Sequence, residues 1–197
     1  MTLLIKINII IVMEKIIEFL KEFDYKYIVA GIVIAILYMV WYSYIRPKRI
    51  RKDVREVLEK IAYYHGYSIE EVKDRTYDFK LTSLGNAKYE KILIRIIDVP
   101  KISAITINNK DTWNLQYGGS GEPGKSYLYH RYIDELKGFL NKEVDENTLK
   151  LIIVYKTTKK IQRYLNESEI EITKHQDKIY DYKVITFYDL YSHFTDL

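Results

Sequence analysis

The residues best suited to chemistry form a glycine-rich stretch, Gly119–Ser126, that fits the pattern G-x-x-x-x-G-K-[ST]. In a phosphate-binding loop of this pattern, backbone N–H groups and a helix N-terminus surround the phosphates, the lysine reaches the outer ones and the hydroxyl ligates Mg²⁺. The preceding segment, Asp111–Tyr117, is short and polar, whereas a nucleotide fold places a buried parallel strand there. Nucleotide binding and a flexible glycine loop capped by a helix both stay open. The candidate ligand-binding residues are Gly119, Gly124, Lys125 and Ser126.

The four histidines are scattered and lack the i, i+4 spacing of a zinc-binding helix, so no metal site is expected from them. His130 is the most interesting, because Arg131 follows it and Tyr127, Tyr129 and Tyr132 flank it. Such a mixed aromatic and basic face can stack bases, although core packing also explains it. Cysteine is absent, which excludes disulfides, thiol nucleophiles and thiolate metal sites.

The elements that would position these residues begin with an amphipathic helix over Asp53–Tyr64, for which Gly66 suits the C-terminal cap. A further turn of helix is expected in Ser68–Asp74, where Ser68 resembles an N-cap. Alternating apolar residues then predict a hairpin and two more strands. Their expected ranges are Tyr77–Leu81 and Tyr89–Ile97 for the hairpin, then Ile102–Ile107 and Trp113–Tyr117.

The C-terminal part is expected to alternate helices and strands. Tyr127–Leu140 and Thr158–Leu165 read as helices, Leu149–Tyr155 as a continuous apolar strand, and Lys183–Tyr188 as the final strand. This order predicts an α/β fold in which one transmembrane helix precedes a three-layer α/β domain with a mixed sheet.

The order of helix, antiparallel strands, tryptophan, loop, helix, strand, helix and strand resembles the nuclease-related domain (NERD) of the PD-(D/E)XK superfamily. The resemblance covers about Asp53 to Leu190, and Trp113 through Leu140 into the strand LIIVY carries most of it. It implies a restriction-endonuclease-like fold and a Mg²⁺-dependent nuclease.

The same resemblance matches Asp78 to the metal-binding aspartate of that family. The next strand would then present Glu-x-Lys, two carboxylates in total for Mg²⁺ and a lysine for the attacking water. Here Ile92–Ile96 carries only Arg95 as a charged residue, and Glu90 and Lys91 are adjacent at the start of the strand. The candidate catalytic residues are therefore Asp78, Glu90 and Lys91, in a degenerate motif that indicates a fold kept for binding.

An apolar segment near the N-terminus, Tyr27–Ile45, runs without a charge. About 20 apolar residues in a helix cross a bilayer, and aromatic residues cluster at both ends of this one. A basic strip follows immediately: Arg46, Lys48, Arg49, Arg51, Lys52 and Arg55. The expected organisation is an N-terminal amphipathic segment at 1–24, a transmembrane helix at 25–46 and a cytoplasmic α/β domain at 51–197.

Orientation follows from the flanks of this segment, because Lys and Arg gather on the cytoplasmic side. The basic strip outnumbers Lys15, Lys21 and Lys26, so we expect the C-terminal domain in the cytoplasm of a single-pass cell-membrane protein. The strip could also hold anionic headgroups. The run from Leu3 to Met13 is too short to span and lacks a signal-cleavage pattern, and Met13 is an alternative translation start.

The composition limits the partners. The net charge of +4 is smaller than the charge of the basic strip alone, so the domain is nearly neutral and nucleic-acid binding is not favoured. Abundant Ile, Lys, Glu and Tyr, with 20 tyrosines, fit a hyperthermophile or AT-rich codon usage. We expect a membrane-anchored domain that binds a protein or another ligand without a cofactor. The alternatives are a NERD-type nuclease using Mg²⁺ and a nucleotide binder.

Overall fold

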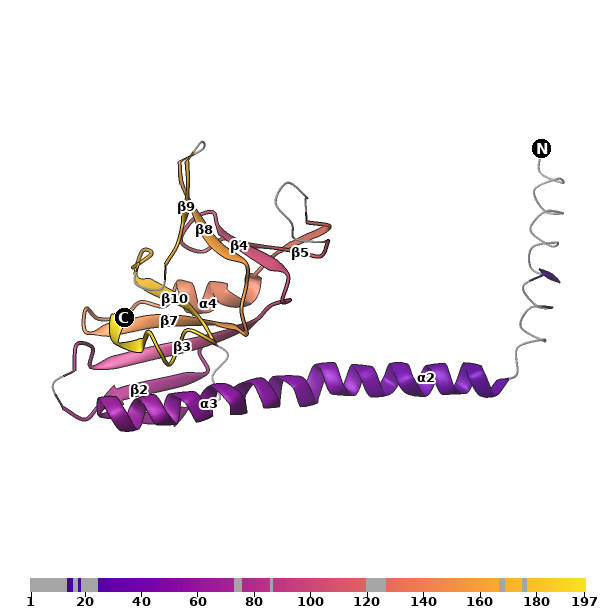
Figure 1. The fold of residues 1–197 in the computed structure, drawn as a ribbon, viewed down its shortest axis with the longest axis horizontal. Helices are drawn as coiled ribbons and strands as arrows, with labels where there is room; N and C mark the ends of the chain where they lie inside the picture. The colour runs from indigo at the N-terminus through magenta and orange to yellow at the C-terminus, as the bar shows by residue number, and fades with distance from the viewer. Residues whose placement is uncertain are drawn as a thin grey trace. The chain divides into compact units, whose positions relative to one another are not determined.

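The structure, a computed structural model, describes residues 14–15, 18, 25–72, 76–85, 87–119, 127–166, 169–174 and 177–197. The chain divides into two compact units, Met1–Arg49 and Ile50–Leu197. The first unit contains the apolar helix, and the second contains all the strands (Figure 1). Most of the N-terminal segment predicted to be amphipathic, residues 1–24, lies outside the described residues.

The apolar helix α2, Tyr25–Val40, buries none of its residues. Large aliphatic side chains such as Ile34 and Leu37 are 65% and 62% exposed. A helix that packs on a soluble core buries an apolar stripe, whereas α2 is apolar and exposed on all sides. Among the described residues, this is one helix long and apolar enough to cross a membrane, which confirms the predicted apolar helix.

A π-helical turn, η1 at Trp41–Ile45, follows α2 and leads into α3, Arg46–His65. Pro47 lacks an N–H group and cannot donate to the carbonyl of Ser43, so the regular α-helical ladder is interrupted where the π turn lies. The helix nevertheless continues, and α3 starts at Arg46 instead of the predicted Asp53. The basic strip is therefore helical.

Helix α3 packs on the sheet through one apolar stripe, whose buried members are Ile50, Val54, Leu58, Ile61 and Ala62. The spacing of three and four residues places these side chains on one face, as predicted. Gly66 follows the last helical residue with φ of +68°, the left-handed conformation that a C-terminal cap requires.

Sheet A has the strand order β1-β2-β3-β7-β10 and is mixed. Its first three strands pair antiparallel, and β7 pairs parallel with both β3 and β10. The predicted hairpin is confirmed as β2 and β3, and all of β7 is buried. The bounds are β1 Tyr67–Glu71, β2 Phe79–Ser83, β3 Lys91–Asp98, β7 Thr148–Tyr155 and β10 Tyr182–Thr186.

Sheet B has the order β6-β5-β4-β8-β9. Strands β4 and β8 pair parallel, and the remaining neighbours pair antiparallel. The bounds are β4 Ser103–Ile107, β5 Trp113–Tyr117, β6 Tyr129–Tyr132, β8 Lys160–Asn166 and β9 Glu169–Ile172. The short helices η2, Asp134–Leu136, and α4, Lys137–Leu140, follow β6, and η3, Phe194–Asp196, closes the chain.

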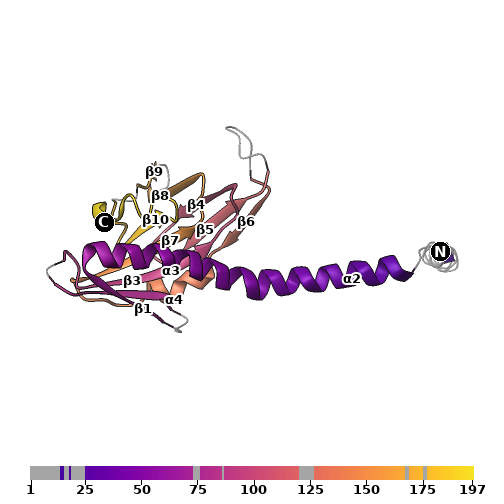
Figure 2. The same cartoon turned by 60° about the horizontal axis from the view of Figure 1, so that its bottom comes forward.

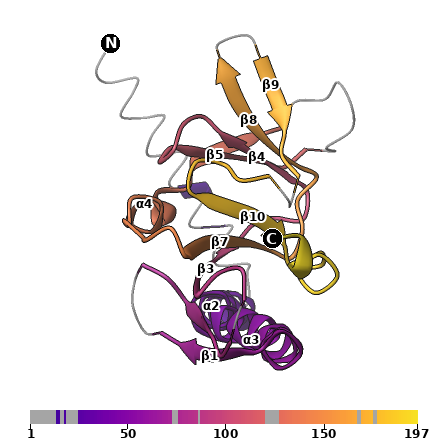
Figure 3. The same ribbon diagram turned by 90° about the vertical axis from the view of Figure 1, so that its left-hand side faces the viewer.

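Two apolar cores hold the domain in three layers of helix, sheet and sheet (Figures 2 and 3). Successive residues of β3 point to opposite faces, so Ile92 and Ile94 pack toward α3. Leu93 and Ile97 pack into the second core, with the inner face of sheet B and with α4. The expected three-layer α/β domain with a mixed sheet is thus present, but its third layer is a second sheet.

The prediction of a helix is wrong for three segments. Ser68–Asp74 contains β1, Thr158–Leu165 contains β8, and Tyr127–Leu140 contains β6 and only short helices at its end. Each stretch contains residues that favour strands when a neighbouring strand is available, such as Ile69 in the first, Ile161 in the second and Tyr129 in the third. Helical spacing alone does not reveal that neighbour, because β8 pairs with β4, from which β5, β6, α4 and β7 separate it in the sequence.

Candidate functional site: the outer face of sheet B

Asp78, the candidate metal-binding acid, is buried at one end of the β2–β3 hairpin and is 4% exposed. Its Oδ1 accepts a hydrogen bond from Arg51 of α3, and its Oδ2 accepts one from the backbone N–H of Ile96 at 2.8 Å. Arg95 lies 3.5 Å from the same Oδ2. The carboxylate of Asp78 is therefore bound by two arginines and one backbone N–H group, and it connects α3 to the hairpin.

Glu90 and Lys91 lie at the opposite end of the hairpin from Asp78. Ser83 donates its N–H to the carbonyl of Glu90, which places Glu90 five residues away from Asp78 along the strand. At about 3.3 Å per residue this separation is about 16 Å, too far for two carboxylates to share one metal ion. Glu90 instead accepts a hydrogen bond from Asn147 at 3.3 Å, and Lys91 lies 3.9 Å from Asp145. Within the described ranges, no group of three acidic or histidine side chains could hold a metal ion.

The glycine-rich stretch has the wrong flanks for a phosphate loop. Residues 120–126, which include Gly124, Lys125 and Ser126, lie outside the described residues. Before them, β5 pairs antiparallel on both sides, and Gly118 and Gly119 have φ of +80° and +77°. The next element is the strand β6. The helix N-terminus that would face the phosphates is therefore missing from the described flanks.

His130 lies on β6 instead of the predicted helix, at the edge of sheet B. Because alternate residues of each strand share a face, the register collects a set of side chains on the side of sheet B away from the core. We call this set the outer face of sheet B, and it comprises Ala104, Thr106, Asn114, Gln116, His130, Tyr132, Lys160, Gln162 and Ile172.

The outer face has a polar centre and an apolar rim. Gln162 donates a hydrogen bond to Thr106 at 2.9 Å, and both are buried. The rim is exposed: Tyr132 is 59% and Ile172 66% accessible, and Tyr164 and Ile170 extend the same side of the β8–β9 hairpin. None of the nine residues is acidic. In Figures 1 and 3, no described helix covers the outer face of sheet B. Helix α4 lies on the other side of this sheet, between the two sheets.

Of the residues on this face, the sequence patterns single out His130 and its neighbour Tyr132. Asn114 and Gln116 were assigned to a strand, but no neighbouring strand was predicted beside them. Tyr132, Lys160 and Gln162 were assigned to helices. The available signal is that Ile161 lies between the polar residues Lys160 and Gln162; of the side chains described in β8, 160–165, those of Ile161 and Gln162 are buried.

In the core between the two sheets, the fully buried Lys150 forms an ion pair with the partly exposed Asp181, with 2.7 Å between Nζ and Oδ2. Burial lowers the pKa of Lys150, and Asp181 opposes that shift. Burial acts to raise the pKa of Asp181, but hydrogen bonds and charges from Lys150 and Lys110 outweigh it and lower that pKa. Burial also raises the pKa of Tyr182, whose hydroxyl accepts a hydrogen bond from Trp113. Lys150 and Tyr182 thus have structural partners in the core, and Oδ2 of Asp181 is shared by two lysines.

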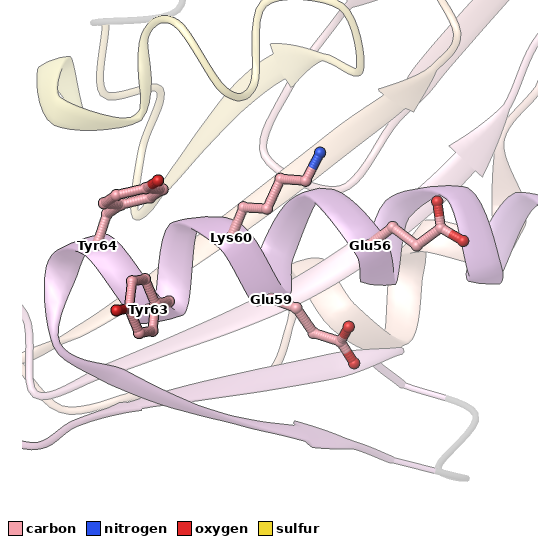
Figure 4. Close-up of a pocket in the computed structure, with 5 residues that line it drawn as sticks. All are labelled: Glu56, Glu59, Lys60, Tyr63 and Tyr64. Carbon is pink, nitrogen blue, oxygen red and sulfur yellow. The ribbon is translucent and has the colours of Figure 1, made fainter.

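A second surface feature, a shallow depression on α3, is lined by Glu56, Glu59, Lys60, Tyr63 and Tyr64 (Figure 4). All five residues come from the same helix. Lys52 and Arg55 pair with Glu56 and Glu59, respectively, and the two tyrosine rings meet edge to face at 5.3 Å. Because no second element contributes to it, the depression does not converge on a ligand as a cleft would.

Comparison with family models, curated proteins and solved structures finds no match to this chain. The function must therefore follow from the geometry of the chain itself. Asp78 is held by structural partners, no helix N-terminus lies in the described flanks of the glycine-rich stretch, and the outer face of sheet B carries an exposed rim of aromatic and aliphatic side chains.

Proposed function

We propose that this protein is a single-pass membrane protein whose C-terminal domain is a non-catalytic binding module on the cytoplasmic side. The observation that carries the proposal is the complete exposure of α2, which is apolar on every side. In water, such a surface would be unfavourable at about 25 cal/mol per Å² of apolar area, whereas lipid removes that cost.

A cleaved signal sequence would have the same apolar character. Cleavage requires small residues after the apolar run, but Arg46, Pro47 and Lys48 follow it, in a helix that continues to His65. These features support a segment that stays attached as an anchor. The basic strip after it supports a cytoplasmic domain, since positive flanks are retained on that side.

The outer face of sheet B supports the binding role. Tyrosines and amides provide large contact area and adaptable hydrogen bonds, and exposed aliphatic residues such as Ile172 add apolar area. A face of this composition is better suited to bind a protein than the phosphate backbone of a nucleic acid. Lys160 is the only permanently charged residue among the nine that define the face. The nuclease alternative has no support from the positions of Asp78 and Glu90.

Single cysteines test the anchor and its orientation, because the chain has no cysteine of its own. Lys101→Cys and Glu14→Cys place one thiol at an exposed position on each side of α2. In intact cells, a membrane-impermeant maleimide should label Glu14→Cys, and it should label Lys101→Cys only after permeabilisation. Labelling of Lys101→Cys in intact cells would contradict the proposed orientation. Release of the protein from membranes by alkaline carbonate would contradict the proposed anchor.

Photocrosslinking tests the binding face. A photoreactive phenylalanine analogue in place of Tyr132 should give one adduct of defined mass in cells, and the same analogue in place of Tyr63 on α3 should not. Asn114 is the register neighbour of Tyr132, so Asn114→Arg should abolish the adduct. An adduct that persists in Asn114→Arg, or that also forms from position 63, would contradict the assignment of this face.

A further inference from the structure

We infer that the outer edge of strand β9 pairs antiparallel with the same edge of a second copy of this chain, which joins two copies of sheet B into one continuous sheet. The inference rests on the proposed binding role of the outer face of sheet B, and it names the partner at one margin of that face. It does not depend on the membrane anchor, because every residue that it uses lies in the second unit.

Strand β9 is an edge strand of sheet B and pairs with β8 on one side. Thr173 donates its N–H to the carbonyl of Ile161 on β8 at 2.9 Å. In an antiparallel pair, residues that exchange such bonds alternate with residues whose N–H and C=O groups point the other way. The backbone groups of Ile170 and Ile172 therefore point away from β8, and no described strand lies beyond them (Figure 3).

The side chains at this edge are aliphatic and exposed. Ile170 is 49% and Ile172 is 66% accessible, and both lie on the same side of the sheet. Tyr164, the register partner of Ile170 on β8, is 41% exposed beside them. Exposed edge strands are commonly protected by Lys or Pro, whereas the two residues with outward backbone groups here are isoleucines. Such an edge is a template for the addition of another strand.

The strand is complementary to itself when it is turned end for end. The outward backbone groups fix the register, in which Ile170 of each copy lies opposite Ile172 of the other and each pair exchanges both of its N–H···O bonds. The isoleucine side chains then pack against one another across the junction. The acidic start of one strand, Glu169, lies along the basic end of the other, Lys174, so the charges of the two copies are complementary.

The side chains on the other side of β9 also fit this register. The hydroxyl of Thr173 is buried and has no hydrogen-bond partner among the described residues. In the paired edges it lies opposite Glu169 of the second copy, whose carboxylate can accept a hydrogen bond from it. Glu171 lies opposite the same residue of the second copy. Arg163 compensates its negative charge, because Nε and Nη2 both lie 2.6 Å from Oε2 of Glu171.

A single cysteine on the symmetry axis tests this pairing, because the chain has no cysteine of its own. Position 171 faces itself in the second copy with about 4.5 Å between the two Cα atoms, a separation that a disulfide can bridge. Under mild oxidation of the full chain in detergent, Glu171→Cys should convert most of the protein into a disulfide-linked dimer. Ser68→Cys is the matched control, since Ser68 is exposed on β1, an edge strand of sheet A, and it should stay monomeric.

A second substitution separates strand pairing from random collision. Ile172→Lys in the Glu171→Cys background places a charge on the edge and should prevent most of the crosslinking. The exposed position of Ile172 means that the domain should keep its fold, which circular dichroism checks. The register is tested by mixing Ile170→Cys with Ile172→Cys, which should give more disulfide-linked dimer than either variant alone.

Two results would overturn the inference: crosslinking of Glu171→Cys that does not exceed that of Ser68→Cys, or crosslinking that Ile172→Lys leaves unchanged. An adduct from the photoreactive residue at position 132 would in that case still support the proposed binding role of the face. Crosslinking at position 171 without an adduct from position 132 would support the inference and overturn the role of the remaining face.

Discussion

Lys150 Nζ lies 2.7 Å from Asp181 Oδ2, and the side chain of Lys150 is completely buried. The same ammonium donates to the carbonyls of Leu140 at 2.6 Å and Lys142 at 3.0 Å, at the C-terminal end of α4. The ammonium of Lys150 on β7 thus pairs with the carboxylate of Asp181, just before β10. It also donates hydrogen bonds to carbonyls at the end of α4 that have no partner within the helix. This pair joins sheet A to the helix that lies between the two sheets.

Lys150→Met should destabilise the domain by about 3–5 kcal/mol, because it leaves the carbonyls of Leu140 and Lys142 without their donor and removes the nearer of the two cations beside Asp181. Unfolding of the full chain in detergent, followed by Trp113 fluorescence in a Trp41→Phe background, measures the loss. Lys110→Met removes the other cation near Asp181, at 3.3 Å and half exposed, and should cost within about 1 kcal/mol. Equal losses in the two variants would contradict the special role of Lys150.

The pH dependence of stability should reveal the contribution of the ionised carboxylate of Asp181. Its pKa is lowered in the folded domain, so its contribution to stability is present above its unfolded pKa of about 3.9 and is lost as the pH falls through the lower folded value. The difference in melting temperature between the wild type and Asp181→Asn should therefore be large at pH 7 and shrink below about pH 4. A difference that is constant from pH 7 to pH 3 would show that the carboxylate charge contributes nothing.

Asp78→Ala should destabilise the domain by about 3–5 kcal/mol, because it leaves Arg95 and the N–H of Ile96 unsatisfied in a buried position. Asp78→Asn keeps one oxygen for Ile96 and should lose less. Glu90→Ala is the matched control at an exposed position and should change stability by about 0.5 kcal/mol or less. Thermal unfolding of the three variants distinguishes this from a catalytic role, in which Asp78→Ala would leave the stability unchanged.

Leu58→Ala should cost about 2–5 kcal/mol, because Leu58 is 0% exposed in the core between α3 and sheet A. Tyr63→Ala lies on the same helix but is 83% exposed, and it should change stability by about 0.5 kcal/mol or less. Chemical denaturation of both variants checks the orientation of α3. A larger loss for Tyr63→Ala than for Leu58→Ala would show that the other face of the helix is packed.

Much of the fold could be predicted from local patterns. The buried stripe of α3, the β2–β3 hairpin and the apolar strand β7 each follow from spacing within a few neighbouring residues. The candidate site could not be predicted in the same way. The local pattern predicts a strand for Asn114 and Gln116. It predicts helices for the segments of β6 and β8, which complete the face, because their apolar residues also fit a helical period.

The sequence by itself determined the helix of the first unit and the inward face of each correctly identified element, because charge, side-chain size and spacing act over one or two turns. Only the tertiary structure decided which strands pair, since β4 pairs with β8, and β7 with both β3 and β10, although other strands lie between the partners in the sequence. It also decided that Asp78 holds two arginines and that His130 joins an exposed sheet face. Those outcomes depend on partners far away in the chain, whose approach no local pattern specifies.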